Sequence, residues 1–250
     1  MERRVVVITG ASNGIGEGIV RYLSKYDYNI VLNYNTSKDK ALKIQNEIFE
    51  KFGKQIEIFK ADVSKRKEVK ELVEFCIEKF KRIDVLINNA GISQIKPFTD
   101  ITDEDWNNII QVNLTSAFYT SQECLRYMIK EKNGCIINIS SIWGKTGASC
   151  EVHYSVSKAG LDGLTKSLAK ELGPSNIRVN GIAPGIIDTR MNNDLTKEDI
   201  ESIKEEIPLE KIGNVVDIAK CVKWLIEDEY TTGQIIGING GWNISVSYTH

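Results

Sequence analysis

The stretch "TGASNGIG", residues 9–16, decides the fold of this chain. It follows the β-branched run "RVVVI" (4–8) and leads into "IGEGIVRYLSKY" (15–26), in which apolar residues recur at helical spacing. A glycine-rich turn between a strand and a helix is the context that a dinucleotide-binding loop requires. The stretch therefore predicts such a loop, with the amino end of the helix facing the anion.

The glycines of this turn have separate predicted roles. Gly10 permits a tight turn, Gly14 lets the backbone approach a pyrophosphate, and Gly16 lets the helix pack closely on the sheet. The residues of the turn expected to bind the dinucleotide are Gly10, Ser12, Asn13, Gly14, Ile15 and Gly16.

Outward from this turn, apolar strand-like runs alternate with longer amphipathic segments. Strands that are apolar throughout and separated by helices indicate a parallel sheet covered on both faces. We predict one doubly wound, Rossmann-type α/β domain over residues 1–250, with helices on both faces of a seven-stranded parallel sheet. A long helix is predicted over 103–134, with Thr102 and Asp105 capping its start. The predicted strands are 4–10, 28–34, 55–63, 83–91, 135–141, 177–185 and 233–241.

Composition excludes several classes of protein. The chain is 42% hydrophobic and 26% charged, which is ordinary for a soluble globular protein, and its net charge of −2 favours neither nucleic acid nor a membrane as a partner. It has no apolar run long enough to span a membrane and no signal peptide at its start, so we expect a cytoplasmic protein. Five scattered cysteines read as reduced thiols, and two histidines, His153 and His250, argue against a histidine-rich metal site.

The end of the second strand bears on the choice of dinucleotide. In an NAD site an acidic side chain after this strand usually holds the ribose 2′-hydroxyl. Here the position falls among Asn33, Tyr34 and Asn35, none of which is acidic. A 2′-phosphate is tolerated without a carboxylate, so NADP(H) is favoured, with NAD(H) as the alternative. The residues expected to serve this end of the cofactor are Asn35, Thr36, Ser37 and Lys38.

Six elements in order resemble the short-chain dehydrogenase/reductase family over nearly the whole chain. Within the family the chain looks most like the 3-oxoacyl-[acyl-carrier-protein] reductases, which implies an oxidoreductase of fatty acid biosynthesis. The elements are "TGASNGIG" (9–16), "NNAG" (88–91), Asn113, "SS" (140–141), Tyr154-x-x-x-Lys158, and "PG" (184–185) with Thr189 after it.

The resemblance implies a catalytic role for four residues. Ser141 would hold the substrate carbonyl oxygen, and Tyr154 would be the proton donor in ketone reduction. A free tyrosine has a pKa of about 10, and the cation of Lys158 one helical turn away would lower that pKa. Lys158 would also bond the nicotinamide ribose, and Asn113 would hold a water that passes protons to it.

The resemblance also implies further cofactor contacts. Asp62 and Val63 match the adenine contact after the third strand, and "NNAG" lines the cofactor after the fourth. Thr189 matches the residue that holds the nicotinamide carboxamide, with Ile187 contributing its backbone. The contacts implied in these regions, with the catalytic pair included, are Asp62, Val63, Asn88, Asn89, Ala90, Gly91, Tyr154, Lys158, Pro184, Gly185, Ile187 and Thr189.

The substrate end leaves alternatives open. The stretch 186–213 is expected to be a substrate lid, and it carries eight acidic and four basic residues. Acyl carrier protein is acidic, and the two basic docking positions of the carrier-protein reductases align here with Lys132 and Ser175, beside Glu131. The predicted docking patch is therefore weaker than the family's, and the acidic lid would suit a cationic substrate.

The run 140–154 supports a second substrate. Trp143, Cys150 and Glu151 resemble the reductases that act on the 5-aminopentanone group of elongation factor P, where Glu151 would pair with the amine. A third reading, a dinucleotide sensor without catalysis, is disfavoured because Tyr154 and Lys158 are both present. The resemblance also implies a homotetramer packed through the helices around 104–131 and 151–173.

Overall fold

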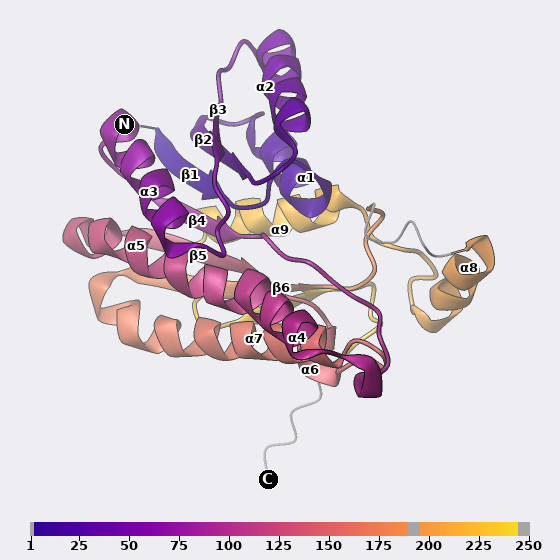
Figure 1. The fold of residues 1–250 in the computed structure, drawn as a ribbon. Coiled ribbons are helices and arrows are strands. Elements are labelled where there is room, and N and C mark those ends of the chain that lie inside the picture. The colour runs from indigo at the N-terminus through magenta and orange to yellow at the C-terminus, as the bar shows by residue number, and fades with distance from the viewer. Residues whose placement is uncertain (1–2, 190–195, 245–250) are drawn as a thin grey trace.

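The computed structural model describes residues 3–189 and 196–244 (Figure 1). These residues form one α/β domain around a seven-stranded, all-parallel sheet in the order β3-β2-β1-β4-β5-β6-β7, which confirms the predicted fold class. The strands are β1 (Arg4–Ile8), β2 (Tyr28–Tyr34), β3 (Glu57–Lys60), β4 (Val85–Asn88), β5 (Gly134–Ile139), β6 (Ile177–Pro184) and β7 (Ile235–Ile238).

Helices cover both faces of the sheet (Figure 1). One hydrophobic core joins α1, α2 and α9 to one face, and a second joins α3, α5 and α7 to the other. The helices are α1 (Gly14–Leu23), α2 (Lys38–Phe52), α3 (Arg66–Phe80), α4 (Asp103–Ile110), α5 (Ser116–Glu131), α6 (Trp143–Thr146), α7 (Val152–Leu172), α8 (Lys197–Glu206) and α9 (Val215–Glu227), with the short turns η1 (Phe98–Asp100), η2 (Gln111–Thr115) and η3 (Gly173–Ser175).

The strand pattern explains the two cores. Successive strand side chains point to opposite faces, so in β1 the side chains of Val6 and Ile8 enter the core with α1 while Val7 enters the core with α3. The strand order reverses at β1, since β2 lies on one side of it and β4 on the other. Ligands of doubly wound sheets bind beyond the carboxyl ends of the strands at such a reversal.

The prediction of one helix over 103–134 is wrong, because the helix is interrupted and ends at Glu131, before Gly134 begins β5. The helix is divided into α4 and α5 by the π-helical turn η2, where the Ser116 N–H donates to Gln111. The Ser116 hydroxyl donates to the carbonyl oxygen of Val112 at 2.6 Å. Such wide turns are frequent at functional sites, and this one carries Asn113, which is 1% exposed. The predicted cap is confirmed, because Thr102 and Asp105 form a reciprocal capping box on α4.

The segment predicted as a lid stands out from the sheet and contains α8 (Figure 1). Its two ends pair with each other, since Ile187 and Gly213 form an isolated parallel bridge. Residues 190–195 of this predicted lid lie outside the described residues. Among the residues described, no helix has the length and apolar character needed to cross a membrane.

Candidate active site

The turn between β1 and α1 has the geometry that its glycines predict. Gly10 and Gly14 have φ angles of +59° and +53°, a region that side chains rarely adopt. A Cβ on Gly10 would stand 2.8 Å from the Cα of Ala90, and one on Gly16 would stand 2.5 Å from the Nδ2 of Asn89. The turn is therefore packed directly against the end of β4, which brings the predicted loops 9–16 and 88–91 together.

Two asparagines, the buried Asn33 and the half-buried Asn89, hold this turn in place. Asn33 accepts from the Gly10 N–H at 3.1 Å and donates to the carbonyl oxygen of Ala61 at 3.0 Å. Asn89 donates from Nδ2 to the carbonyl oxygens of Thr9 and Gly10 at 2.9 and 3.0 Å. Asn33, one of the three positions considered for the ribose, is 1% exposed and is used inside the protein.

The amino end of α1 is open to an anion. Its N-cap residue, Asn13, makes no side-chain capping bond to the helix, so the first N–H groups of α1 are not satisfied by that side chain. The nearest atom that a Cβ on Gly14 would meet is the Cγ2 of Thr189, at 3.7 Å. Gly14 therefore faces Thr189 at ordinary contact distance, and the helix end without a side-chain cap behind this glycine turn fits the pyrophosphate of a dinucleotide.

Lys40 was not among the residues predicted from the sequence. Its Nζ atom donates to the Oδ1 atom of Asn13 at 2.9 Å, which places an ammonium beside the glycine turn. Asn35 and Thr36 are exposed and Ser37 is half-buried at the start of α2, close to this ammonium in sequence. Lys40 lies in the first turn of α2, and side chains of a helix tilt toward its amino end. A lysine at this position, close to the loop before the helix, was the signal that the sequence offered.

The other predicted cofactor residues lie near the carboxyl ends of the strands, where the protein itself bonds or packs against them. Asp62 accepts from the Ser64 backbone and hydroxyl at 3.1 and 2.6 Å, and Val63 is buried beside it. Pro184 ends β6, and a Cβ on Gly185 would stand 2.9 Å from the Cβ of Asn239. Ser12 is buried and Ile15 packs on the core, so neither side chain is free in the open turn. Ile187 is buried at the base of the predicted lid.

The four predicted catalytic residues meet beyond the carboxyl ends of β4 and β5. Ser141 follows β5, and its hydroxyl lies close enough to Tyr154 to act on the pKa of the phenol. The Nζ atom of Lys158 lies 5.6 Å from the centre of the Tyr154 ring. A Cβ on Gly91 would stand 3.4 Å from the Oδ1 atom of Asn113 and 3.5 Å from the Nζ atom of Lys158, so both side chains border the end of β4.

Burial decides the protonation of the tyrosine and the lysine. It raises the pKa of Tyr154 to about 12, against the effect of the Ser141 hydrogen bond and with a smaller contribution from the Glu151 charge. Burial also lowers the pKa of Lys158 to about 8, and the Asp162 charge acts in the opposite direction. The effect of Lys158 on this pKa stays a prediction; in the structure its ammonium donates to the Ile139 carbonyl oxygen at 2.9 Å.

Asn113 is fixed by the segment that follows β4. Its Oδ1 atom accepts from the Ile92 N–H at 2.8 Å, and its Nδ2 atom donates to the Ile92 carbonyl oxygen at 2.9 Å. Nδ2 also donates to the Ser157 hydroxyl on α7 at 3.1 Å. The side chain therefore joins η2, the end of β4 and the helix that carries Tyr154.

Aromatic and acidic side chains lie on the segments next to α7 and in the segment that contains α8. The rings of Trp143 and Trp242 meet edge to face with centres 5.2 Å apart, and the Trp242 indole N–H donates to Glu206 of α8 at 3.1 Å. Glu151, the N-cap residue of α7, is half-buried, and this burial raises its pKa. Cys150 has a φ angle of +58° beside it.

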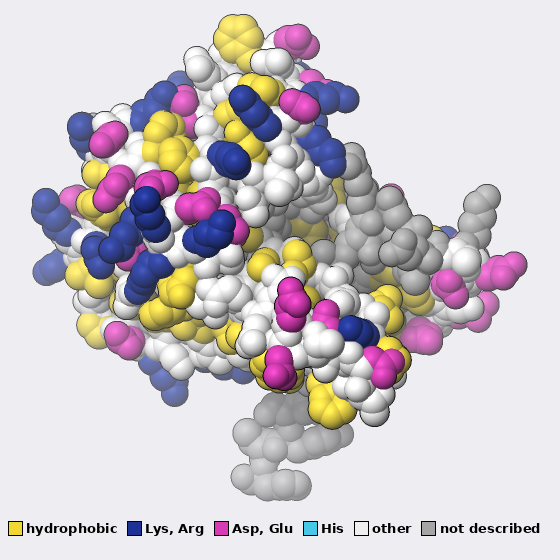
Figure 2. Space-filling view, viewed as in Figure 1, with side chains coloured by type: hydrophobic (Ala, Val, Ile, Leu, Met, Phe, Trp, Pro, Cys, Tyr) yellow, Lys and Arg dark blue, Asp and Glu magenta, His cyan; other side chains and the backbone are white. Residues whose placement is uncertain are grey.

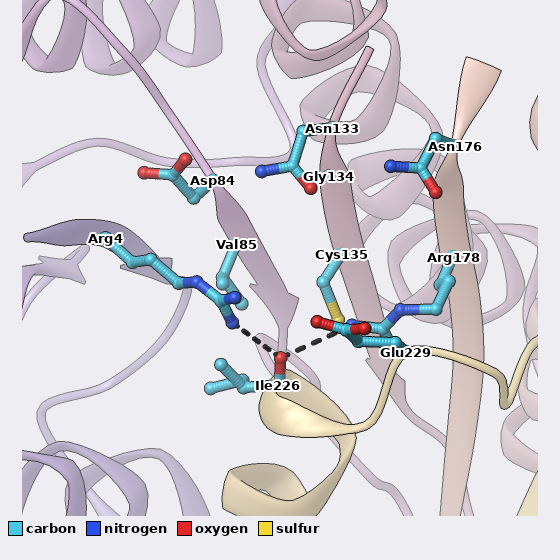
Figure 3. A pocket seen from close by; sticks show the side chains of 10 residues that line it. All are labelled: Arg4, Asp84, Val85, Asn133, Gly134, Cys135, Asn176, Arg178, Ile226 and Glu229. Atoms are coloured by element: carbon cyan, nitrogen blue, oxygen red, sulfur yellow. Dashed lines mark hydrogen bonds between the residues drawn. The ribbon is translucent and has the colours of Figure 1, made fainter. Parts of the chain in front are cut away.

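A separate polar cavity of about 270 Å³ lies at the amino ends of the strands (Figure 3). Arg4 and Arg178 both donate to the Ile226 carbonyl oxygen, at 2.9 and 3.3 Å, and Arg178 also donates to that of Leu225. The last carbonyl groups of a helix lack intrahelical partners, so these arginines complete the carboxyl end of α9. The cavity holds none of the predicted catalytic residues.

The glycine turn, with a helix end open to an anion, lies beside a buried Ser–Tyr–Lys group where the strand order of the sheet reverses. Together these features define the class of dinucleotide-dependent oxidoreductases. The chain belongs to the short-chain dehydrogenase/reductase family, since residues 4–200 match the family model described as short chain dehydrogenase. Enzymes of this family act on CH–OH or C=O groups with a nicotinamide dinucleotide.

Relatives match over nearly the whole chain. A Bacillus subtilis (strain 168) protein named "Uncharacterized oxidoreductase YmfI" is 38% identical over 96% of this chain and 99% of its own length. The 3-oxoacyl-[acyl-carrier-protein] reductase FabG of Buchnera aphidicola subsp. Baizongia pistaciae is 40% identical over 96% of this chain and 97% of its own length. That of Thermotoga maritima is 39% identical over 96% and 98%. The predicted resemblance is confirmed.

Proposed function

We propose that this protein reduces a ketone to a secondary alcohol with NADPH, and that its substrate is a 3-oxoacyl thioester on acyl carrier protein. The observation that carries the reaction type is the buried group of Ser141, Tyr154 and Lys158, which borders the same strand ends as the glycine turn. The names of two relatives, both 3-oxoacyl-[acyl-carrier-protein] reductase, support the proposal that the substrate is a thioester.

The bound nicotinamide would supply the hydride. The Ser141 hydroxyl donates to the substrate carbonyl oxygen and holds it beside Tyr154. Because its pKa is about 12, Tyr154 is neutral at pH 7 and holds the proton that the developing alkoxide takes. The phenolate left behind is stabilised by the Lys158 ammonium and the Ser141 hydroxyl, and Asn113 holds the water through which the proton returns.

The choice of NADP(H) rests on the charges around the adenosine end. No acidic residue stands at 33–35, and the Lys40 ammonium lies at the glycine turn through its bond to Asn13. A 2′-phosphate at this place would meet a cation and exposed hydroxyl and amide groups, whereas a bare 2′-hydroxyl would lack its usual carboxylate. NAD(H) remains the alternative cofactor.

A specific observation favours a second candidate, the reduction of the 5-aminopentanone group on elongation factor P. The half-buried Glu151 lies near enough to Tyr154 for its charge to act on the phenol, so a cationic substrate group would find a partner within the site. Acidic side chains also gather on α8, whereas basic and acidic side chains are mixed on the side of α3 and α5 (Figure 2).

The positions associated with carrier docking give the thioester less support. Lys132 ends α5, and its carbonyl oxygen accepts from the Asn176 side chain at 3.2 Å, so positions 132 and 175 lie near one another. They precede β5 and β6, whereas Ser141 follows β5, so they lie at the opposite end of the sheet from the reacting groups. One of the two carries serine, as in the sequence-based expectation.

One experiment separates the two candidates. NADPH oxidation is followed with acetoacetyl-[acyl carrier protein] and with aminoketone-modified elongation factor P under the same conditions, using the wild type and Tyr154→Phe. Turnover of the thioester alone supports the first candidate, and turnover of the modified factor alone supports the second. Full activity of Tyr154→Phe would contradict the proposed proton donor, because phenylalanine has no proton to give. If neither is reduced while NADPH binds, the dinucleotide sensor becomes the better account.

Exposed apolar side chains support a homotetramer. Trp106 on α4, Phe118 and Ile129 on α5, and Val156 on α7 are 37–46% exposed on the helices expected to pack between copies. Large exposed apolar surfaces mark interaction sites. Sedimentation of the wild type against Phe118→Glu tests this arrangement, with dissociation of the variant expected.

A further inference from the structure

The segment 92–96, between β4 and η1, is bonded at every second residue. Ile92 exchanges two hydrogen bonds with Asn113, at 2.8 and 2.9 Å. Gln94 is bonded to His153 and Asp105, and the Lys96 N–H donates to the Cys150 carbonyl oxygen at 2.7 Å. Side chains between these anchors remain accessible, since Ile95 is 73% exposed. The segment thus forms a wall tied to a catalytic residue at one end and to the loop before Tyr154 at the other.

A chain of side-chain hydrogen bonds joins this wall to α7. The Nε2 atom of His153 lies 2.8 Å from the Oε1 atom of Gln94, and Gln94 Nε2 donates to Asp105 Oδ1 at 2.8 Å. Asp105 Oδ2 accepts from Lys96 Nζ at 2.6 Å and belongs to the capping box of α4. Segment 92–96, α4 and α7 therefore meet at Gln94.

The direction of these bonds follows from the charge of Asp105. The hydrogen bond from Lys96 has the largest effect on the pKa of Asp105, and the bonds from Thr102 and Gln94 act in the same direction. Together they hold this pKa well below its usual range, so the carboxylate only accepts hydrogen bonds. Gln94 must then present Nε2 to Asp105 and Oε1 to His153. His153 must in turn carry its proton on Nε2, which leaves a lone pair on Nδ1. That Nδ1 atom is buried and has no hydrogen-bond partner among the described residues.

His153 has a place in the site but no part in the proton transfer. It is fully buried in the first turn of α7 and is the residue directly before Tyr154. A satisfied core histidine would not need to reach across to the wall, whereas this one meets Gln94, which together with Lys96 joins the wall to Asp105 of α4. The bond fixes the position of segment 92–96 relative to the phenol.

We propose that His153 is a positioning residue, which through Gln94 holds the wall 92–96 at one distance from Tyr154 so that the substrate carbonyl is presented to the phenol. This inference rests on the proposed ketone reduction at the same site. It assigns His153 no contact with the reacting atoms.

The arrangement makes the wall sensitive to protonation of the imidazole. Burial lowers the pKa of His153, with the Asp105 carboxylate acting to raise it and the Lys96 ammonium acting to lower it. The titratable groups nearest to it in sequence are Tyr154, directly after it, and Glu151 and Cys150 before it. A second proton would sit on Nδ1, which has no acceptor among the described residues. The wall is therefore held in place at a pH above the pKa of His153 and loosens at a lower pH.

Nuclear magnetic resonance tests the arrangement without any substrate. The chain has two histidines, so ¹⁵N-labelled imidazole gives two sets of signals, and a His250→Asn variant assigns them. We expect His153 to show the Nε2–H tautomer and to titrate below the ordinary pKa of about 6.5. An Nδ1–H tautomer, or titration at the ordinary value, would overturn the proposed direction of the bonds.

Kinetics test the consequence, with two variants chosen to differ in one hydrogen bond. His153→Leu removes the donor to the half-buried Gln94 Oε1 atom, and we expect kcat/KM for the ketone to fall by about ten- to a hundredfold. His153→Gln keeps an Nε2 donor that cannot take a second proton, and we expect this variant to retain activity. In the wild type, protonation of His153 should lower kcat/KM at acid pH, and this acid limb should be absent from the profile of His153→Gln. NADPH affinity, measured by fluorescence, should stay the same in both variants.

Controls separate a positioning role from a structural one. Glu104→Gln, an exposed neighbour of Asp105 outside the bonded chain, should change nothing. If His153→Gln is as impaired as His153→Leu at equal thermal stability, or keeps the same acid limb, the proposal is wrong. If wild type and Tyr154→Phe both fail to reduce any ketone, the proposed function is wrong instead, and the tautomer measurement still decides the bonding.

Discussion

The ammonium of Lys158 lies 5.6 Å from the centre of the Tyr154 ring and donates to the Ile139 carbonyl oxygen at 2.9 Å. Its cation therefore acts on the phenol through space. Both groups are buried, so each is pushed toward its neutral form, with a pKa of about 12 for Tyr154 and about 8 for Lys158. The site holds a protonated acid at pH 7 beside a cation that is close to losing its proton.

The first prediction is an alkaline limb in ketone reduction. The cation that stabilises the phenolate is present below the Lys158 pKa and is lost above it, so kcat should fall as pH rises through about 8. Tyr154 stays protonated in this range and does not produce the limb. A profile of kcat against pH at saturating NADPH checks this, and Lys158→Arg should remove the limb from whatever activity it retains. A wild-type rate that stays level through this pH would contradict the assignment.

The second prediction concerns stability. The pKa of Lys158 is lowered from 10.5 to about 8 on folding, so between these values the unfolded chain holds a proton that the folded chain has lost, and stability rises with pH. Below about pH 8 the buried charge destabilises the fold at its full value. We expect Lys158→Met to raise the free energy of unfolding at pH 7 by about 1–3 kcal/mol, while it abolishes reduction.

Urea denaturation of wild type and Lys158→Met at pH 7 checks this, with the exposed Lys166→Met on the same helix as the matched control. The control should leave the free energy of unfolding unchanged within about 0.5 kcal/mol. A less stable Lys158→Met would show that the Ile139 bond outweighs the burial of the charge.

The third prediction uses two glycines with the same backbone conformation. Gly14 and Gly53 have φ angles of +53° and +63°, and a Cβ on Gly53 would meet nothing within 4 Å. Alanine at either position should cost about 1–2 kcal/mol of stability, because side chains disfavour this region. Gly14→Ala should in addition weaken NADPH binding, since its methyl would stand where the pyrophosphate approaches the backbone. Fluorescence titration and urea denaturation of both variants measure the two effects, and equal NADPH affinity in both would remove Gly14 from the cradle.

Much of this site follows from local sequence, and the rest depends on contacts between distant segments. The glycine turn, the capping box of Thr102 and Asp105, and the Tyr154–Lys158 spacing are short-range features, so their positions were predictable. Asn33 differs, because its side chain is bonded to Gly10 after β1 and to Ala61 after β3. The tyrosine pKa also depends on burial by the whole fold, which the four-residue spacing does not contain.

The same distinction applies to the residues that the sequence did not single out for the site. Lys40 is joined to Asn13 across 27 positions, and His153 is joined to Gln94 across 59. No periodicity marks such pairs, because each residue looks like an ordinary surface or core position in its own helix. The π-turn at Asn113 is likewise invisible in an amphipathic pattern that continues on both sides of it.

The fourth prediction concerns cofactor choice. Lys40→Ala should lower kcat/KM for NADPH by about tenfold and leave that for NADH unchanged, because a charge-assisted bond to the 2′-phosphate is lost. Lys43→Ala is the matched control, since Lys43 lies on the same helix and is exposed beside Glu47. Initial rates with both cofactors and one ketone check this. An equal loss with NADPH and NADH would place Lys40 in the turn without a role at the phosphate.

The last prediction decides what the site acts on. Burial raises the pKa of Glu151, and its charge acts on Tyr154, so the carboxylate costs free energy unless a cation comes to it. With an aminoketone substrate, Glu151→Gln should lower kcat/KM by about tenfold or more, because the ammonium loses its partner. With an acetoacetyl thioester the same change should leave the rate unchanged or raise it. Glu171→Gln, at the exposed far end of α7, is the control. A uniform loss on both substrates would mean that Glu151 serves the start of the helix, and the aminoketone candidate would then lose the contact that favours it.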